Sequence, residues 1–431
     1  MFKSRPGWGD VGFHGSHQVK TPNIDLLAGS GIILNNYYVS PICSPSRSAV
    51  LTGYHPIHTG QQHDALQAAE PRGIPLQYKL LPQHLKNLGY ETHAVGKWHQ
   101  GYFKREYTPT QRGFDSYFGF FNGHEDYYDR VCGGGYTGFD FRDNENAVNL
   151  TEYTGIYSTD IYTNKAIDII NRSSNSTKPL FLYLAHQSVH AGNGANPLQA
   201  PQRYIDRFKD IEDMRRRTFV AMVSALDDSV GDVFSALQKA NILNDTIIIF
   251  TTDNGGASCG ADGTCIDSSI GSNWPLRGGK FTLLEGGIRG IAFIWSPLLR
   301  KTYISDHLMH VTDWLPTIYS AVGGKTEDLG PIDGIDMWNI LNDNLQNPRK
   351  HLLHNIDPTW KMWALRYGDY KLISGTFVDG NYDIWYLPPD IVKTMLNLLE
   401  AYNASAVPPA NLPNDEKANP KYHNNFWSIW E

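Results

Sequence analysis

The sequence predicts an α/β protein with a mixed, mainly parallel sheet covered by helices, and three observations predict it. Residues 180–185 (LFLYLA) form a short continuous apolar run, which is typical of a strand buried on both faces. Residues 246–252 are mostly β-branched and lead into Asp253 and Asn254. Residues 215–240, which lie between them, carry apolar side chains at helical spacing. Helices that alternate with buried strands favour parallel pairing with both faces of the sheet covered.

Shorter elements are predicted along the first half of the chain. A Thr-Pro pair begins a helix over residues 21–27, and a glycine closes another over residues 81–90. A strand is expected to lead into residues 95–99. Within the helix at 215–240, the acidic residues Asp227, Asp228 and Asp232 are expected on the solvent side.

The pattern changes after about residue 345. Residues 362–373 predict a two-stranded turn with Gly-Asp at its tip, and residues 392–402 predict a helix. The tail after Val407 is rich in proline and asparagine and is expected to lie extended on the surface. We therefore expect a catalytic domain over residues 1–345 and a smaller C-terminal antiparallel subdomain with a helix over residues 346–431.

Composition excludes some classes of protein and leaves others open. The 431 residues, 41% of them hydrophobic, are enough for a large core. A net charge of −7 gives no indication of a nucleic-acid partner, and no apolar run approaches a membrane span. Cys259 and Cys265 could close a short disulfide, although metal ligation and free thiols remain open.

Glycosylation signals and the N-terminal residues point in different directions. Five N-x-S/T sequons favour a secreted or lysosomal glycoprotein, and they lie at Asn149, Asn171, Asn175, Asn244 and Asn403. The first eight residues (MFKSRPGW) contain no apolar segment of a signal peptide. We therefore expect either a cytosolic chain or a missing true start, and we favour the missing start.

The run PICSPSRSAVLTG, which begins at Pro41, carries the most chemical information. Cys43 and the residues up to Arg47 predict an exposed loop that enters a helix, because Pro45 suits a first helical turn. A nucleophile there gains from the helix dipole and from N–H groups that bind anions. Arg47 adds a forked cation that suits sulfate or phosphate oxygens. The run predicts a nucleophile that acts on an anionic ester; the alternative is a buried, inert cysteine in a turn.

Two other segments carry candidate site residues. Lys97 and His99 lie two residues apart at a strand end, so their side chains face the same way. Asp253 and Asn254 stand beyond the carboxyl end of a strand, where such sheets bind ligands. Their oxygens suit Ca²⁺ or Mg²⁺ better than zinc. Taken alone, each segment also has an ordinary structural interpretation, as surface and core residues or as an Asx turn.

Together these segments resemble the sulfatase family, and most closely its arylsulfatase B-like branch, which includes N-acetylgalactosamine-4-sulfatase. The run at Cys43 matches C-x-P-S-R-x-x-x-L-T-G at every fixed position, residues 96–101 match G-K-W-H-x-G, and residues 253–255 match the metal-binding D-N-G. Residues 273–290 resemble the segment with the second sulfate-binding lysine, here Lys280. Residues 188–190 resemble the catalytic histidine segment, with His190 as counterpart and His186 as its rival. The resemblance runs nearly end to end and implies an alkaline-phosphatase-like fold.

The resemblance also implies a mechanism and its partners. A formylglycine-generating enzyme would oxidise Cys43 to formylglycine in the endoplasmic reticulum, and a hydroxyl of the hydrate would attack sulfur. Lys97, Lys280 and a Ca²⁺ ion held by Asp253, Asn254 and the Cys43 product would balance charge on the sulfuryl oxygens. His190 would protonate the leaving alcohol, His99 would take the proton of the second hydroxyl, and Arg47 would orient the diol. A sulfated glycan or an aryl sulfate would be the substrate.

The chain departs from the family pattern before Gly7. Family members carry a strand that ends in two adjacent metal-binding aspartates, and the matching positions here are Ser4, Arg5 and Pro6. Neither aspartate is present, and we expect the strand before them to be missing as well. Arg5 would repel a calcium ion. Asp10 is the counterpart of neither ligand. A truncated or misassembled start would explain the missing signal peptide, strand and ligands together.

Three functions remain open on the sequence. The first is a calcium-dependent sulfatase, and the second is a catalytically impaired relative that binds a sulfated glycan or a partner. The third is a phosphodiesterase or phosphonate hydrolase of the same superfamily. If the missing N-terminus carries a signal peptide, the sulfatase would be lysosomal or secreted.

Overall fold

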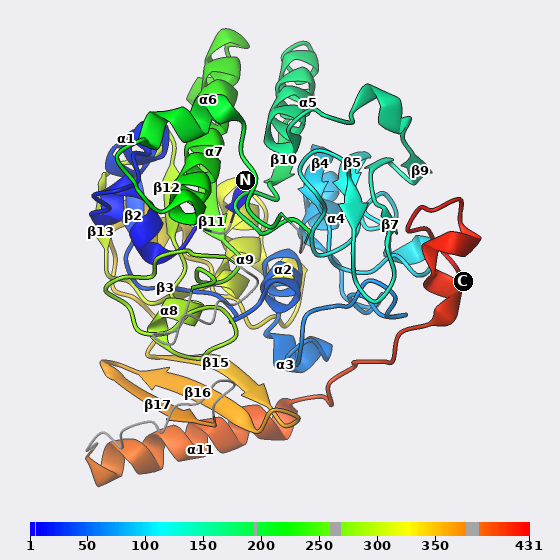
Figure 1. The fold of residues 1–431 in the computed structure, drawn as a ribbon. Helices are drawn as coiled ribbons and strands as arrows, with labels where there is room; N and C mark the ends of the chain where they lie inside the picture. Colours follow the sequence, from blue (N-terminus) through cyan, green and yellow to red (C-terminus); the bar gives the residue numbers. More distant parts are fainter. Residues whose placement is uncertain (5, 194–195, 259–268, 376–387) are drawn as a thin grey trace.

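A ten-stranded mixed sheet runs through the centre of the computed structural model, which describes residues 1–4, 6–193, 196–258, 269–375 and 388–431. The strand order is β13-β2-β12-β11-β1-β10-β4-β5-β8-β9. The five neighbours from β11 to β5 pair in parallel, whereas β12, β8 and β9 run antiparallel to their neighbours. The mixed, mainly parallel sheet expected from the apolar runs is confirmed (Figure 1).

The strands of the described residues are β1 (Phe2–Ser4), β2 (Ile32–Leu34), β3 (Tyr37–Tyr38), β4 (Glu91–Lys97), β5 (Ser116–Phe120), β6 (Val131–Cys132), β7 (Gly138–Phe139), β8 (Arg142–Asp143), β9 (Asn146–Ala147), β10 (Leu180–Ala185), β11 (Ile248–Thr252), β12 (Ala292–Trp295), β13 (Tyr303–Ser305), β14 (Met309–His310), β15 (His351–Asp357), β16 (Met362–Tyr367) and β17 (Tyr370–Ser374).

The α-helices of the described residues are α1 (Pro22–Gly29), α2 (Cys43–Thr52), α3 (Pro56–Thr59), α4 (Leu81–Asn87), α5 (Ser158–Ser173), α6 (Gln202–Ile205), α7 (Met214–Lys239), α8 (Glu285–Ile288), α9 (Trp314–Ala321), α10 (Trp338–Asp343) and α11 (Pro389–Ser405). Short 3₁₀ helices lie at η1 (Trp8–Asp10), η2 (Gly12–His14), η3 (Arg105–Tyr107), η4 (Leu150–Glu152), η5 (Asp206–Phe208), η6 (Leu243–Asp245), η8 (Val311–Asp313), η9 (Thr326–Leu329), η10 (Glu416–Ala418) and η11 (Pro420–Tyr422).

The strand before Gly7 is present, which corrects the expectation that it is missing. Residues Phe2–Ser4 pair in parallel with β11 on one side and with β10 on the other, so β1 occupies the middle of the sheet. Three residues carry too little pattern to indicate a strand from sequence. The pairing partners on both edges, rather than local propensity, hold this segment extended.

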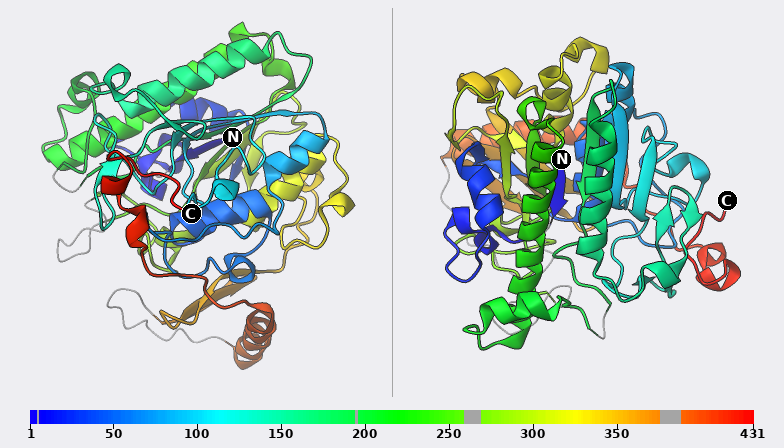
Figure 2. Two further views of the ribbon diagram at one scale, coloured as in Figure 1. Left: turned by 90° about the vertical axis from the view of Figure 1, so that its right-hand side faces the viewer. Right: turned by 90° about the horizontal axis from the view of Figure 1, so that it is seen from above.

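Helices cover both faces of the sheet (Figure 2), and adjacent strand residues belong to different cores. Ala94, Tyr183 and Ile249 belong to a core with residues of α2, α4 and α9. Their neighbours Val95, Leu184 and Phe250 belong to a second core with residues of α1, α5 and α7. This alternation is what a strand buried on both faces requires, and it explains the continuous apolar runs in the sequence.

The sequence led us to expect Asp227 on the solvent side of α7, but the structure places it elsewhere. Its side chain is buried and accepts hydrogen bonds from the backbone N–H of Asn23 at 3.2 Å and of Ile24 at 2.8 Å. The carboxylate therefore caps α1, whose first N–H groups have no partner within their own helix. Burial raises the pKa of Asp227 to about 6.

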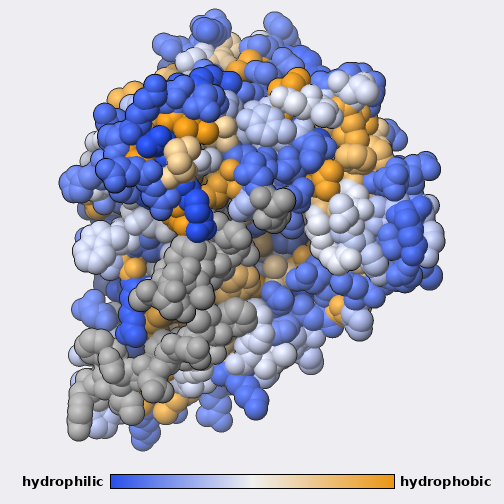
Figure 3. Space-filling model, in the orientation of Figure 1, coloured by the Kyte–Doolittle hydropathy of each residue, from blue (hydrophilic) through white to orange (hydrophobic). Residues whose placement is uncertain are grey.

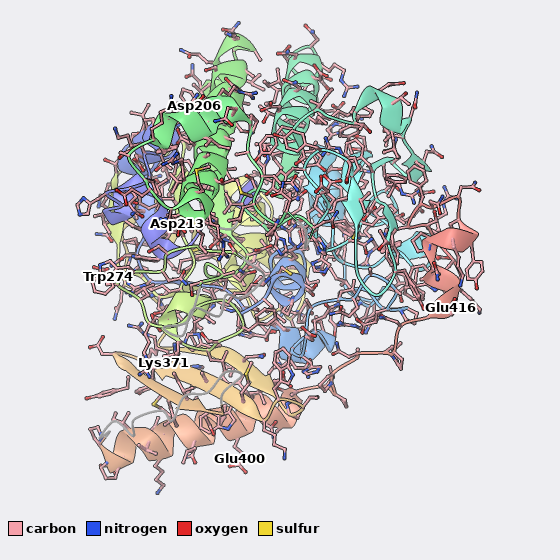
Figure 4. All side chains as sticks on the ribbon, viewed as in Figure 1. Asp206, Asp213, Trp274, Lys371, Glu400 and Glu416 are labelled. Atoms are coloured by element: carbon pink, nitrogen blue, oxygen red, sulfur yellow. The ribbon has the colours of Figure 1, made fainter. Side chains whose placement is uncertain are left out.

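A separate antiparallel sheet of β15, β16 and β17 lies with α11 at one end of the molecule (Figure 1). β16 and β17 form the predicted hairpin, in which Tyr367 pairs with Tyr370 across Gly368-Asp369. Lys371 on β17 reaches toward the larger body and pairs with Glu285 of α8 at 2.7 Å (Figure 4).

The C-terminal segment lies mostly on the surface, as expected, but a buried tryptophan anchors it. Trp427 is fully buried, joins the core beneath the sheet, and donates its indole N–H to the backbone oxygen of Cys132 at 3.1 Å. The proline- and asparagine-rich composition of the tail conceals this anchor. Residues 408–431 thus leave α11 and return to the larger body (Figure 2).

Hydrophilic residues cover most of the described part of the face in Figure 3, with apolar residues in small separate groups. Within the described ranges, every helix is too short or too polar to cross a bilayer.

Candidate active site

Cys43 is the first residue of α2 and lies beyond the carboxyl ends of the central strands. The helix begins after the extended residue Ile42 and ends at Gly53, whose positive φ of 74° and N–H bond to the Ala49 carbonyl close it. The sequence suggested that Cys43 lies on an exposed loop, but the residue is buried. Its Sγ lies 3.3 Å from Nδ1 of His99. The first turn of a ten-residue helix therefore presents this side chain to an imidazole.

His99 is held in one orientation by its other ring nitrogen. It follows the end of β4 with a positive φ of 57°, and its Nε2 lies 2.8 Å from the carbonyl oxygen of Leu66. Because a carbonyl only accepts, Nε2 carries the hydrogen, and Nδ1 faces Cys43 as an acceptor. Burial, assisted by the charge of Lys97, lowers the pKa of His99 to about 4. The ring is therefore a neutral base at physiological pH.

Arg47 joins three parts of the site. Its Nε donates to Oδ2 of Asp253 at 2.9 Å, and its Nη1 donates to the backbone oxygen of Lys97 at 2.9 Å. Lys97 is the last residue of β4 and is buried, as are Arg47 and Asp253. One guanidinium thus fixes the helix with Cys43 to the ends of β4 and β11.

Lys280 lies on a loop beside these residues. Its backbone N–H donates to the carbonyl of Gly256 at 3.1 Å, and the next N–H, of Phe281, donates to Pro41 at 2.9 Å. The loop therefore bridges the segment after Asn254 and the segment before Cys43. The Lys280 side chain is buried, with Nζ 5.0 Å from the centre of the Phe281 ring.

The two rival histidines after β10 occupy different places. The buried His186 lies under the sheet with Nε2 3.0 Å from the Ser229 hydroxyl, and burial lowers its pKa to about 3. His190 is half-buried, stacks on His124 at 5.8 Å, and directs Nδ1 to the Ala191 carbonyl at 2.7 Å. His190 lies beside His124, whereas His186 packs between the sheet and α7.

His124 stacks on His190 and follows Gly123, which packs on His99; it was not among the candidate residues expected from the sequence. The adjacent Gly123 packs so closely on His99 that a Cβ there would lie 3.1 Å from the imidazole ring. Ser44 also belongs to this cluster, with its Oγ 3.2 Å from Nε2 of His99. Ser44 lies within the run that begins at Pro41, but its position in that run did not predict a role. Residues 122–128 resemble the family as a stretch, but that resemblance gave His124 no role.

The described residues do not make a calcium site by themselves. Asn254 Nδ2 donates to Gly255, and its buried Oδ1 has no hydrogen-bond partner among the described residues, which suits a metal ligand. However, Arg47 occupies Oδ2 of Asp253, and no group of three His, Cys, Asp or Glu side chains in the described ranges is placed to hold a metal. Calcium takes six to eight oxygens. Asp10 is elsewhere, bound to Arg216 at 2.8 Å.

Cys259 and Cys265, the candidate disulfide pair, lie outside the described residues. Of the cysteines that the structure describes, Cys43 and Cys132 are buried thiols without a disulfide.

A protein-family model, "Sulfatase", matches residues 5–324 of this chain. The chain belongs to the sulfatase family. Arylsulfatase J of Mus musculus is 38% identical to this sulfatase over 98% of the chain and 78% of its own length. N-acetylgalactosamine-6-sulfatase of Homo sapiens is 33% identical over 78% of the chain, which spans 63% of that relative.

Solved structures support the same fold for this sulfatase. The crystal structure of Ps i-CgsB in complex with k-i-k-neocarrahexaose has a TM-score of 0.81 and 28% identity, and it covers 98% of this chain and 95% of that chain. The alkaline-phosphatase-like fold implied by the sequence motifs is confirmed. Family membership supports hydrolysis of sulfuric esters.

Proposed function

We propose that this chain hydrolyses sulfate esters of glycans or aryl alcohols with a nucleophile derived from Cys43. One observation carries the proposal: Cys43 Sγ lies 3.3 Å from Nδ1 of a buried, neutral His99, next to the buried cations Lys97 and Arg47. An imidazole in this position accepts a proton from the group at residue 43. The cations lower the energy of a sulfuryl group beside it.

Conversion of Cys43 to formylglycine by a formylglycine-generating enzyme would replace the thiol with a hydrated aldehyde, which supplies two hydroxyls at the same carbon. Lys97 and Lys280 bind the sulfate oxygens in this proposal, and Arg47 holds the loop. His99 Nδ1 takes one proton from residue 43, since Nε2 remains bonded to Leu66.

His190 is the proposed acid for the leaving alcohol. Its Nδ1 donates to the Ala191 carbonyl, so Nε2 is the nitrogen that exchanges a proton with the substrate. The stacked His124 limits the tilt of the ring. The site thus places an acid and a base on separate loops, as a two-stage ester cleavage requires.

A second function is favoured by the incomplete cation site. Asp253 supplies a carboxylate and Asn254 an amide oxygen, and the described residues contain no group of three His, Cys, Asp or Glu side chains that could hold a metal. A chain with intact sulfate-binding lysines and a poor cation site would bind a sulfated glycan and cleave it slowly.

The test is co-expression with a formylglycine-generating enzyme, followed by assay on 4-nitrophenyl sulfate. We expect mass spectrometry to show oxygen in place of sulfur at residue 43 with loss of two hydrogens. Cys43→Ala should abolish turnover, and Cys132→Ala, which alters the other buried thiol, should retain it. Conversion without turnover would favour the glycan-binding function, and preferential turnover of nitrophenyl phosphate would favour a phosphoesterase.

We also propose that the chain matures in the secretory pathway, in lysosomal or secreted form. All five sequon asparagines are exposed, which is what glycan transfer requires. Removal of N-glycans from protein made in animal cells should increase its gel mobility, and Asn→Gln changes at the five positions should remove that effect.

A further inference from the structure

The loop between β5 and β6 contacts both histidines that the proposed reaction uses. Gly123 packs against the ring of His99, where a Cβ would lie 3.1 Å from Cε1 and Nε2. The next residue, His124, stacks on His190 with ring centres 5.8 Å apart and ring planes 18° apart. Further along, the hydroxyl of Tyr127 donates to the backbone carbonyl of His190 at 2.8 Å. One short segment therefore reaches the proposed base and the proposed acid.

The ring of Tyr127 is held in place by its surroundings. It is fully buried in a core with other aromatic residues and stacks on Tyr157 with ring centres 5.1 Å apart. The backbone carbonyl of Tyr127 accepts from Nη1 of Arg130 at 2.7 Å and from the N–H of Ser158 at 3.0 Å. Because close packing leaves a buried ring few other positions, the hydroxyl is a fixed donor.

The segment that carries His190 lies between β10 and α6, and side chains on both sides of it join it to the loop of Tyr127. Before His190, the side-chain amide of Gln187 donates to the backbone carbonyl of Glu125. After it, Nε2 of Gln199 donates to Oδ2 of Asp126 at 2.5 Å. The tyrosine hydroxyl binds between these two contacts, at the residue with the imidazole.

The hydroxyl acts on the backbone that directs the imidazole. Nδ1 of His190 lies 2.7 Å from the carbonyl oxygen of Ala191, so the ring is bonded to the residue that follows it. The carbonyl that Tyr127 holds belongs to the planar peptide unit between His190 and Ala191. Because this unit contains the Cα atoms of both residues, a bond to its oxygen limits movement of the ring and of the carbonyl that binds it.

We propose that Tyr127 is a positioning residue for proton transfer from His190 to the leaving alcohol. Its hydroxyl fixes the acid to the same loop that packs against the base, and so sets the separation of the two groups. This role rests on the proposed function, since it takes His190 as the acid. As the S–O bond breaks, Nε2 of His190 gives its proton to the ester oxygen. The tyrosine hydroxyl therefore matters most for a basic leaving group and least for a stable phenolate.

The test compares Tyr127→Phe with Tyr128→Phe, which removes the hydroxyl of the adjacent half-buried tyrosine. Each converted enzyme is assayed on phenyl sulfate, which has a basic leaving group, and on 4-nitrophenyl sulfate, which releases a stable phenolate. We expect Tyr127→Phe to lower kcat on phenyl sulfate by roughly tenfold or more and kcat on 4-nitrophenyl sulfate by less than about threefold. Tyr128→Phe should change neither. The ratio of the two rates does not depend on the amount of folded enzyme, and equal losses on both substrates would overturn the positioning role.

Two further measurements separate this role from the proposed function. His190→Ala should show the same dependence on the leaving group, and more strongly. Its absence would mean that His190 is not the acid, whereas its presence in His190→Ala but not in Tyr127→Phe would overturn only the role of Tyr127. A readout without turnover is the NMR signal of the His190 ring in histidine-labelled protein. That signal should move in Tyr127→Phe and stay in place in Tyr128→Phe, and an unmoved signal in both would overturn the inference.

Discussion

Arg47 and Asp253 form a fully buried ion pair, 206 residues apart in the chain, in which two guanidinium nitrogens lie 2.9 Å from one carboxylate oxygen. The pair ties the helix that carries Cys43 to the end of β11. It also neutralises the carboxylate that would otherwise be the strongest cation ligand among the described site residues. The same contact therefore stabilises the site and weakens its hold on a metal.

Removal of one partner of this pair should be costly. Arg47→Met leaves the Asp253 carboxylate buried beside an apolar side chain, and we expect the free energy of unfolding to fall by about 3–5 kcal/mol. Arg300→Met, which breaks the surface pair between Arg300 and Asp343, should change it by less than about 1 kcal/mol. Urea unfolding of both variants checks this, and equal effects would contradict it.

His99 should set the acid limb of activity well below the usual histidine range. Burial and Lys97 lower its pKa to about 4, so the neutral base persists down to that pH. We expect kcat/KM of the converted enzyme on 4-nitrophenyl sulfate to fall only near pH 4. His99→Ala should lower kcat by roughly 10²–10⁴. The exposed His17→Gln should leave kcat unchanged, and an acid limb near 6.5 would argue against His99 as the base.

The sequence predicted the sheet and the site better than it predicted connections between distant segments. β10 and β11 were visible because strands buried on both faces need continuous apolar residues. Lys97 and Asp253 lie at the ends of strands, and Cys43 begins a helix in a recognisable motif. Asp227 was misjudged because its partner is the start of a helix 203 residues earlier. Trp427 was hidden in a polar tail. Neither contact leaves a local periodicity in the sequence.

Calcium binding should be weak in this chain and should rise when two carboxylates are restored. Ser4→Asp with Arg5→Asp adds two hard ligands at the positions that match the family's aspartate pair and removes a positive charge. We expect calcium to raise the unfolding midpoint of this variant and to have little effect on the parent. Ser4→Asn with Arg5→Asn removes the charge without adding carboxylates. If calcium raised the unfolding midpoint of this control as much as that of the Asp variant, positions 4 and 5 would not be the places of the metal-binding carboxylates.

Stability should fall below neutral pH because of histidines buried without charge. Burial lowers the pKa of His55 from 6.5 to about 4, and its ring lies 4.6 Å from that of His310, whose pKa burial also lowers. A histidine whose pKa is depressed in the folded state stabilises the fold above pH 6.5 and loses that contribution as the pH falls toward 4. For His55 the loss of folding free energy over this range is about 3 kcal/mol. Urea unfolding at pH 7 and pH 5 should show a smaller loss for His55→Gln than for the parent. The exposed His17→Gln should lose as much as the parent, and identical losses for all three would exclude His55 as a source.

The C-terminal segment should contribute to the stability of the larger body. Trp427 is fully buried in the core and bonds to Cys132, so Trp427→Ala should lower the free energy of unfolding by about 3–5 kcal/mol. Trp274 offers a matched control, because it is 79% exposed on a loop at the edge of the molecule (Figure 4). Trp274→Ala should change the free energy by less than about 1 kcal/mol. Denaturant unfolding measures both, and a loss for Trp427→Ala no larger than that for Trp274→Ala would mean that the tail is not anchored in the core.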